Sequence, residues 1–195
     1  MFTLYLKWGF WAVFWLLVAA VLHYTLPQHD IVRITDTYEK RVDPGNNALF
    51  WSGAEGGSDP NVTTRDVFFI QAFQGDGDPM IYRNEDTGWG WPPYFKFDSA
   101  NLHARAKDMV SPQNADPPQW VVLRHYGWRF EVLSIYPNAV AIRPADGPDQ
   151  RIIPWFNIVF LLVLAGVARA VQVRWRRFRK NRINPVVDEW TDGWG

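Results

Sequence analysis

The 195-residue sequence has no cysteine, only three methionines and only four histidines. The missing cysteine excludes a disulfide scaffold, a thiolate-bound zinc or iron–sulfur centre, and a thiol nucleophile. Net charge is also missing, because 20 basic side chains balance 20 acidic ones. With 48% hydrophobic and 21% charged residues the chain is not wholly disordered. Tryptophan, in contrast, is abundant with 12 residues, and its distribution needs an explanation.

The neutral total conceals an uneven distribution of charge. Residues 1–23 carry one charged side chain, Lys7. Residues 24–152 carry 12 basic and 17 acidic groups, whereas residues 153–195 carry seven basic and three acidic groups. The middle of the chain is therefore acidic and its C-terminal part is basic, and the boundaries coincide with changes in hydropathy.

The first boundary follows an apolar run at residues 8–22, which contains neither charge nor proline. Extended by residues 4–6, with Lys7 reaching the headgroups, the run approaches the ~30 Å of a bilayer core. A cleaved signal peptide is the alternative, because the run length fits an h-region. The single lysine before the run and the aromatic side chains within it favour an uncleaved anchor. We assign residues 1–26 to an N-terminal transmembrane helix.

The second boundary precedes an apolar segment at residues 152–173, which we assign to a C-terminal transmembrane helix. Pro154 suits the first turn of a helix, and Trp155 suits the membrane interface. A buried core helix is the alternative reading. It is disfavoured by a basic cluster directly after the segment: Arg174, Arg176, Arg177, Arg179, Lys180 and Arg182.

The basic cluster predicts the topology. Lysine and arginine close to a transmembrane end stay on the cytoplasmic side, so we expect residues 174–195 to form a basic cytoplasmic tail. Two spans then place both termini in the cytoplasm. The protein is expected in the bacterial inner membrane, with lipid headgroups bound by the basic cluster and no nucleic-acid partner.

The acidic middle, residues 27–151, is expected to be one small α+β domain in the periplasm, mostly of antiparallel β-structure. A helix is predicted at residues 99–110, capped by Asp98 or Ser99. Residues 119–125 and 130–135 are expected to pair as a hairpin, and residues 43–61 to form a glycine-rich loop. The predicted strands are residues 31–38, 66–73, 80–82, 119–125, 130–135 and 139–143.

The densest polar and aromatic stretch is residues 82–98. Glu85 and Asp86 are adjacent, so on a strand they face opposite sides and do not pair as acid and base. Trp89, Trp91 and Tyr94 lie on a glycine- and proline-rich loop, and such side chains dominate interface hot spots. These five residues are our candidates for binding a partner or ligand. Packing of the two tryptophans onto the sheet is the alternative that we favour.

Other chemistry finds little support in the sequence. The four histidines lack metal-ligand spacing, and the Asp76-x-Asp78 pair lacks the further ligands of a calcium loop, so we predict neither a metal site nor a cofactor. No catalytic residue is assigned. An envelope enzyme or ligand sensor remains the alternative, with a pocket near Trp89 and Trp91. The acids and histidines that such a pocket could use are Glu85, Asp86, Asp98, His103 and His125.

Several motifs resemble a known family. The longest is YRNEDTGWGWPPYFKFD at residues 82–98, and HYGWR at 125–129, SIYPN at 134–138 and IPWFN at 153–157 accompany it. Together they are similar to a family of uncharacterised two-pass bacterial inner-membrane proteins, catalogued as a domain of unknown function. The resemblance implies two membrane spans and implies no activity.

The sequence therefore predicts a non-enzymatic role. We expect an accessory, scaffold or assembly protein that binds another envelope protein through its periplasmic domain and its helices. The sequence does not indicate an oligomeric state.

Overall fold

The computed structural model describes residues 2–42, 65–185 and 190. The predicted loop at residues 43–61 therefore lies outside the described residues. The chain divides into two compact units, residues Met1–Ile152 and Ile153–Gly195, and each is considered by itself.

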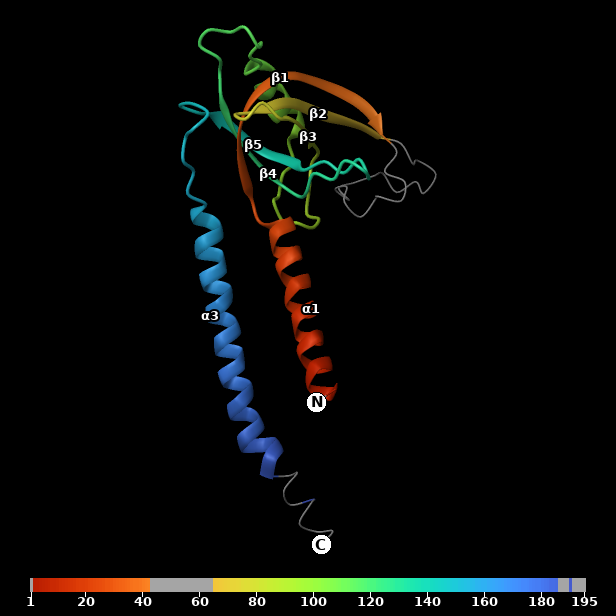
Figure 1. The fold of residues 1–195 in the computed structure, drawn as a ribbon, viewed down its shortest axis with the longest axis vertical. Helices are drawn as coiled ribbons and strands as arrows, with labels where there is room; N and C mark the ends of the chain where they lie inside the picture. The colour runs from red at the N-terminus through yellow and green to blue at the C-terminus, as the bar shows by residue number, and fades with distance from the viewer. Residues whose placement is uncertain (1, 43–64, 186–189, 191–195) are drawn as a thin grey trace. The chain divides into compact units, whose positions relative to one another are not determined.

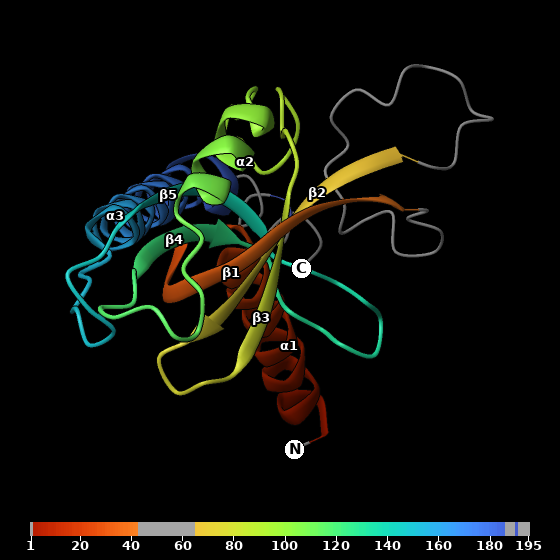
Figure 2. The same ribbon diagram turned by 90° about the horizontal axis from the view of Figure 1, so that it is seen from above.

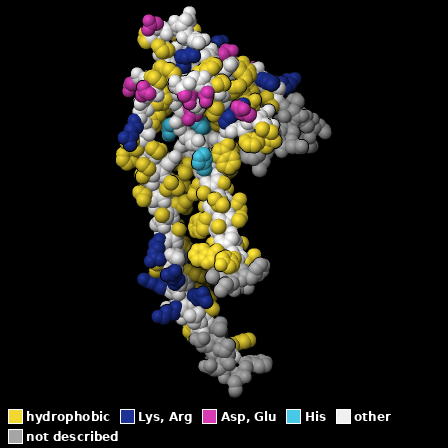
Figure 3. Space-filling view, viewed as in Figure 1, with side chains coloured by type: hydrophobic (Ala, Val, Ile, Leu, Met, Phe, Trp, Pro, Cys, Tyr) yellow, Lys and Arg dark blue, Asp and Glu magenta, His cyan; other side chains and the backbone are white. Residues whose placement is uncertain are grey.

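The first unit begins with helix α1 (Phe2–Thr25), as the apolar run predicts. Thr25 closes its last turn by donating a hydrogen bond from its hydroxyl to the carbonyl of Val21 at 2.8 Å, and Pro27 cannot continue the helix. None of the side chains at residues 5–26 is buried. Figure 3 shows hydrophobic side chains covering this helix. A helix that is apolar on all sides is typical of a membrane span or of a core, and α1 is not in the core.

A five-stranded barrel follows α1 (Figure 1). Its strands are β1 (Gln28–Val42), β2 (Arg65–Gln74), β3 (Pro79–Asn84), β4 (Val121–Tyr126) and β5 (Asn138–Pro144). The closed order is β1-β2-β3-β5-β4. All neighbours are antiparallel except β3 and β5, which meet in parallel at Arg83 and Asn138.

The long strand β1 closes the barrel because it pairs with two neighbours. Its first five residues pair with β4, and from Val32 onwards it pairs with β2, with an irregularity between Ile34 and Asp36. A closed barrel of this order, with a helix between β3 and β4, is the arrangement of the OB-fold. The mostly antiparallel α+β domain predicted from the sequence is confirmed in this form.

Helix α2 (Ser99–Asp108) lies beside the strands (Figure 2) and completes the core. Asp98 caps it as predicted, accepting a hydrogen bond from the backbone N–H of Asn101 at 2.9 Å. Leu102 and Ala106 face the barrel interior. They pack with buried residues of all five strands: Val32, Ile34, Ile70, Ala72, Tyr82, Val121, Leu123, Ala139 and Ile142.

One predicted pairing is wrong. Strand β4 pairs with β5, not with residues 130–135. Residues 130–135 instead form a tight loop in which Phe130 and Ile135 exchange backbone hydrogen bonds of 3.1 and 3.0 Å. Ser134 adopts a positive φ of 52° within it. The pattern failed because Phe130, Val132 and Leu133 of this loop stay exposed and only Ile135 is buried, whereas β5 supplies the small and buried Ala139 to the core.

In the second unit, helix α3 (Trp155–Phe178) begins directly after Pro154 and continues as a π-helical turn, η2 (Arg179–Ile183). The helix is longer than the predicted span because the basic residues also adopt helical structure. None of its residues is buried. Among the described residues, Tyr5–Thr25 and Trp155–Ile183 are the two helical segments long and apolar enough to cross a membrane.

Candidate functional site

The five candidate residues share the loop between β3 and α2, and the structure places them in three different environments. Glu85 is buried among cations, Trp89 and Trp91 are exposed, and Tyr94 reaches the end of α1. Asp86 is half-buried and accepts a hydrogen bond from the Ser99 hydroxyl at 3.3 Å. The loop is thus held to the barrel by buried ion pairs of Glu85, while its tryptophans are exposed.

Glu85 fastens the start of the loop. Its carboxylate forms ion pairs with Arg65 at 2.8 Å and with Arg83 at 3.1 Å. Its backbone N–H donates to Asn138 Oδ1 at 2.9 Å, and its carbonyl accepts from Asn138 Nδ2 at 3.1 Å. Glu85, Arg83 and Asn138 are all buried. Removing one member of such a buried pair leaves an uncompensated charge, so the network holds the loop to the barrel.

Lys96 fastens the end of the same loop, and its role was missed by sequence reasoning. Its Nζ donates to Asn84 Oδ1, to the Glu85 carbonyl at 3.0 Å and to the Ala139 carbonyl at 2.8 Å. Burial lowers the pKa of Lys96 to about 7, against the opposing charges of Asp86 and Glu85. All three donors of the ammonium group find an acceptor. The residue is therefore a cross-link between β3, β5 and the loop.

Trp89 and Trp91 do not pack onto the sheet, so that interpretation was wrong. Their side chains are 81% and 70% exposed. The backbone N–H groups of Thr87 and Gly88 both donate to the Lys96 carbonyl at 3.0 Å, which closes the stem of the loop. Gly88 has a φ of 52°, a conformation that glycine adopts without steric cost. The loop therefore projects its tip away from the barrel.

Two phenylalanines extend this aromatic face. Phe95 and Phe97 are each 54% exposed. Their ring centroids lie 5.4 and 5.5 Å from that of Trp89, in edge-to-face geometry. Such pairs stabilise one another by about 0.5–1.5 kcal/mol beyond their burial. In the structure the two phenylalanines face outward and the lysine between them, Lys96, is buried, which is the opposite of what their hydrophobicity alone would suggest.

Tyr94 connects the loop to α1. Its hydroxyl donates to the Thr25 carbonyl at 2.7 Å, and its ring stacks on Tyr126 with a centroid distance of 4.8 Å. Burial raises the pKa of Tyr94 above its ordinary value. Trp128, just after β4, donates from its indole Nε1 to His23 Nδ1 at 2.9 Å. The end of the barrel from which α1 leaves is thus bonded to the last turn of that helix (Figure 1).

A second buried cluster was also missed. Asp30 accepts from the Tyr82 hydroxyl at 2.6 Å, and the same oxygen lies 2.9 Å from His125 Nε2. Burial by itself raises the pKa of Asp30, but the close contact with the His125 ring and the hydrogen bond from Tyr82 lower it by more, so the net shift is downward. Alternation carries a signal here, because Asp30 is in phase with the buried Val32 and Ile34.

The acids and histidines considered for an enzyme are dispersed. Asp98 caps α2, and His125 pairs with Asp30. The ring of His103 stacks on that of Phe68 with a centroid distance of 4.4 Å. Among the described residues, no group of three or more histidine, aspartate or glutamate side chains is placed to hold a metal ion.

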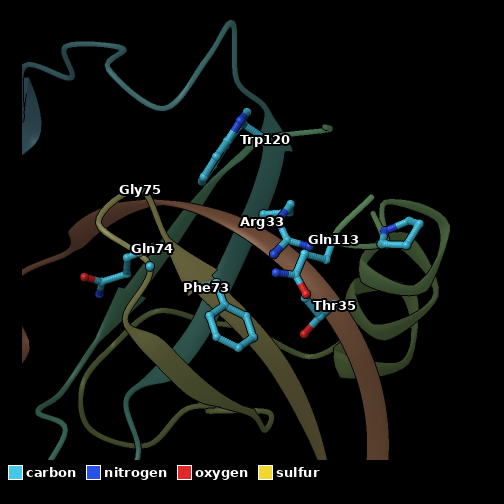
Figure 4. A pocket seen from close by; sticks show the side chains of 9 residues that line it. Arg33, Thr35, Phe73, Gln74, Gly75, Gln113 and Trp120 are labelled. Carbon is cyan, nitrogen blue, oxygen red and sulfur yellow. The ribbon is translucent and has the colours of Figure 1, made fainter. Parts of the chain in front are cut away.

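A pocket of about 590 Å³ lies between β1, the β2–β3 turn and the α2–β4 loop (Figure 4). The Arg33 guanidinium projects among Phe73, Gln113 and Trp120 in this view. Arg33 donates to the Ser111 carbonyl at 2.9 Å and lies 5.8 Å from the centre of the Phe73 ring. The α2–β4 loop, one wall of the pocket, is at the end of the barrel far from α1 (Figure 1).

Comparisons with known proteins agree with the motif resemblance. The model of a family described as "Protein of unknown function (DUF1523)" matches residues 5–179. An "Uncharacterized protein" of Haemophilus influenzae is 38% identical over 146 residues, which cover 73% of this chain and 78% of the relative. No solved structure matches.

Proposed function

The chain belongs to the DUF1523 family of proteins of unknown function, and from its structure we propose that it is a two-pass inner-membrane accessory protein. Its helices anchor a periplasmic OB-fold barrel, and the barrel binds another envelope protein to scaffold or assemble a complex. Both termini are in the cytoplasm in this proposal.

The two apolar helices support the membrane assignment. The segment Tyr5–Thr25 has 21 residues, and none of its apolar window is buried. At 1.5 Å per residue it measures about 31 Å, close to the hydrocarbon thickness of a bilayer. In α3 and η2 the basic side chains gather at the C-terminal end, as expected for the cytoplasmic side of a span (Figure 3).

The pocket of Arg33, Phe73 and Trp120 is the observation that carries the binding role. Arginine and tryptophan are the residue types that most often dominate interface energies, and OB-fold barrels act widely as binding modules. A peptide segment of a partner would place an apolar side chain on Phe73 and Trp120 and an oxygen acceptor on Arg33. This end of the barrel is free to face the periplasm because α1 leaves from the other end.

An envelope enzyme or ligand sensor built on Glu85 and Asp86 has less support. Both carboxylates are held by internal partners, Glu85 by Arg65 and Arg83 and Asp86 by Ser99. Using either group in catalysis would break the fastening of the loop.

Site-specific photocrosslinking in intact cells tests the proposed function. A photoreactive amino acid at the exposed Gln113, on the pocket wall, should form a covalent adduct with one envelope protein. The same amino acid at Ala104, which is exposed on α2, is the matched control. The adduct should be lost with Trp120→Ala. Equal adducts at both positions, or none at Gln113, would contradict the proposal.

A further inference from the structure

Exposed aromatic side chains lie in the β3–α2 loop and at Trp128, the two segments that bond to the last turn of α1, and we name this surface the aromatic foot. Its members are Trp89, Trp91, Phe95, Phe97 and Trp128. We propose that the aromatic foot inserts into the lipid headgroup layer around α1, so that the barrel rests on the membrane surface. This inference rests on the membrane anchoring in the proposed function and uses a surface different from the partner pocket.

The depth of the foot is fixed by hydrogen bonds to α1. Trp128 bonds to His23, and Tyr94, within the β3–α2 loop, bonds to the Thr25 carbonyl. The backbone N–H of Gly127 donates to the Tyr24 carbonyl at 2.9 Å. Only two residues separate α1 from β1. The loops of the foot are therefore held beside the last turn of the helix and cannot move away on a linker.

The apolar length of α1 places that last turn at the membrane interface. The uncharged run at residues 8–22 spans roughly 22 Å as a helix, and His23 is the first polar residue after it. With the run in the hydrocarbon, His23 and Thr25 fall at headgroup level. Trp128 and the loop of Tyr94 then occupy the same level.

The chemistry of the foot fits lipid headgroups. Tryptophan is enriched at membrane interfaces because its ring is apolar while its N–H can bond to polar groups. Residues 87–95 carry no charged side chain, and the neighbouring Lys96 is buried inside the barrel. Insertion of the loop tip therefore desolvates no charge.

The shape of the loop also suits insertion of its tip into a flat lipid surface. The stem is closed by Lys96 and Thr87, so the tip projects without folding back onto the sheet. Tyr94 and Trp128 hold the foot beside the last turn of α1, and the apolar side chains of that helix at residues 5–22 are also unburied.

Spin labels on the cysteine-free chain test the depth of the foot. The full-length protein is placed in phosphatidylcholine nanodiscs without any other envelope protein, with a nitroxide at Pro93→Cys. Pro93 is exposed at the loop tip. A label at Ala104→Cys on α2 serves as the aqueous reference, and one at Leu16→Cys within α1 reports the anchor. Collisions with oxygen and with a water-soluble nickel chelate are measured by electron paramagnetic resonance.

We expect the Pro93 label to be several-fold less accessible to the nickel chelate than the Ala104 label, and the Leu16 label to be shielded most. Trp89→Ser combined with Trp91→Ser should return the Pro93 label to the aqueous value. Phe130→Ser, an exposed aromatic outside the foot, should leave it shielded.

Equal accessibility at Pro93 and Ala104 overturns the inference. If the Leu16 label is shielded in that case, the anchor stands and only the foot fails. If the Leu16 label is also exposed, the anchoring itself fails. Shielding of Pro93 in native membranes but not in nanodiscs would assign the foot to a protein partner and would equally overturn a lipid role.

Discussion

At the scale of single residues, buried polar groups decide how the barrel presents its surfaces. Asp30 could be recognised from the sequence, because strand alternation places it on the same face as Val32 and Ile34. Lys96 could not, because Phe95 and Phe97 on either side have the higher hydrophobicity and are expected inside. Its burial depends on three acceptors supplied by β3, the following loop and β5. Such long-range acceptors leave no local signal.

Lys96→Met should destabilise the protein by about 2 kcal/mol or more. The methionine preserves the apolar stem, but the acceptors on Asn84, Glu85 and Ala139 lose their donor while remaining buried. The measurement is thermal unfolding of the detergent-solubilised protein. Lys107→Met, at an exposed position on α2, is the matched control and should change little. Equal effects of the two variants would mean that the cross-link contributes nothing specific.

Asp30→Asn should destabilise the protein by about 1–3 kcal/mol at neutral pH, since Tyr82 and His125 lose a charged acceptor. The pKa of Asp30 is lower in the folded chain than its ordinary 3.8. Its contribution is therefore complete above pH 3.8 and is lost as the pH falls further, through the folded-state pKa. The difference between wild type and variant should shrink over that range in pH-dependent unfolding.

Asp108→Asn, at an exposed position on α2, provides the control for the Asp30 experiment. It should show no comparable pH-dependent difference. A gap between wild type and Asp30→Asn that stays constant from neutral pH to well below 3.8 would contradict the assignment of the lowered pKa to Asp30.

At the scale of elements, those with local signals were predictable. The apolar runs of α1 and α3, the alternation in β1, and the apolar composition and neighbouring turn residues of β2, β3 and β5 predicted elements of the right type within a few residues. The partner of β4 was predicted wrongly, because pairing depends on which segment can fill the core. Residues 130–135 are apolar enough for a strand, but Phe130, Val132 and Leu133 stay exposed, and Ala139 and Ile142 of β5 fill the core instead. Of the candidate site, the sequence indicated the loop but not which of its side chains face outward.

The N-terminal cap of α2 was predicted correctly from the sequence, and its energetic contribution can be tested. Asp98→Ala should destabilise the protein by about 1 kcal/mol, because the N–H of Asn101 loses its cap. Hydrogen exchange of the first-turn amides of α2 should accelerate more than that of the barrel strands. Ala104→Gly, in the middle of the same helix, should instead weaken the whole helix by about 1 kcal/mol through backbone entropy. Unchanged exchange in the first turn of Asp98→Ala would show that the cap has no energetic role.

At the scale of the whole molecule, the two-span topology that we propose would explain both the distribution of charge and the distribution of tryptophan. In the sequence the acidic barrel lies between two apolar helices, and most of the basic residues outside it gather at the C-terminal end of α3 and in η2. Trp155 lies at the beginning of α3, and Trp89, Trp91 and Trp128 lie around the end of α1. With both helices in a bilayer, these tryptophans fall at interfaces, where their free energy is lowest. One topology thus accounts for two otherwise unrelated compositional features.

Thiol labelling provides a direct measurement of this topology, because the chain contains no cysteine of its own. Ala104→Cys on α2 and Lys180→Cys in η2 are both at exposed positions. In intact spheroplasts, a membrane-impermeant maleimide should label Ala104→Cys and should label Lys180→Cys only after lysis. The basic cluster around Lys180 is the physical cause, since moving it across the membrane is unfavourable. The reverse pattern would invert the topology, and labelling of both sites before lysis would exclude a second span between them.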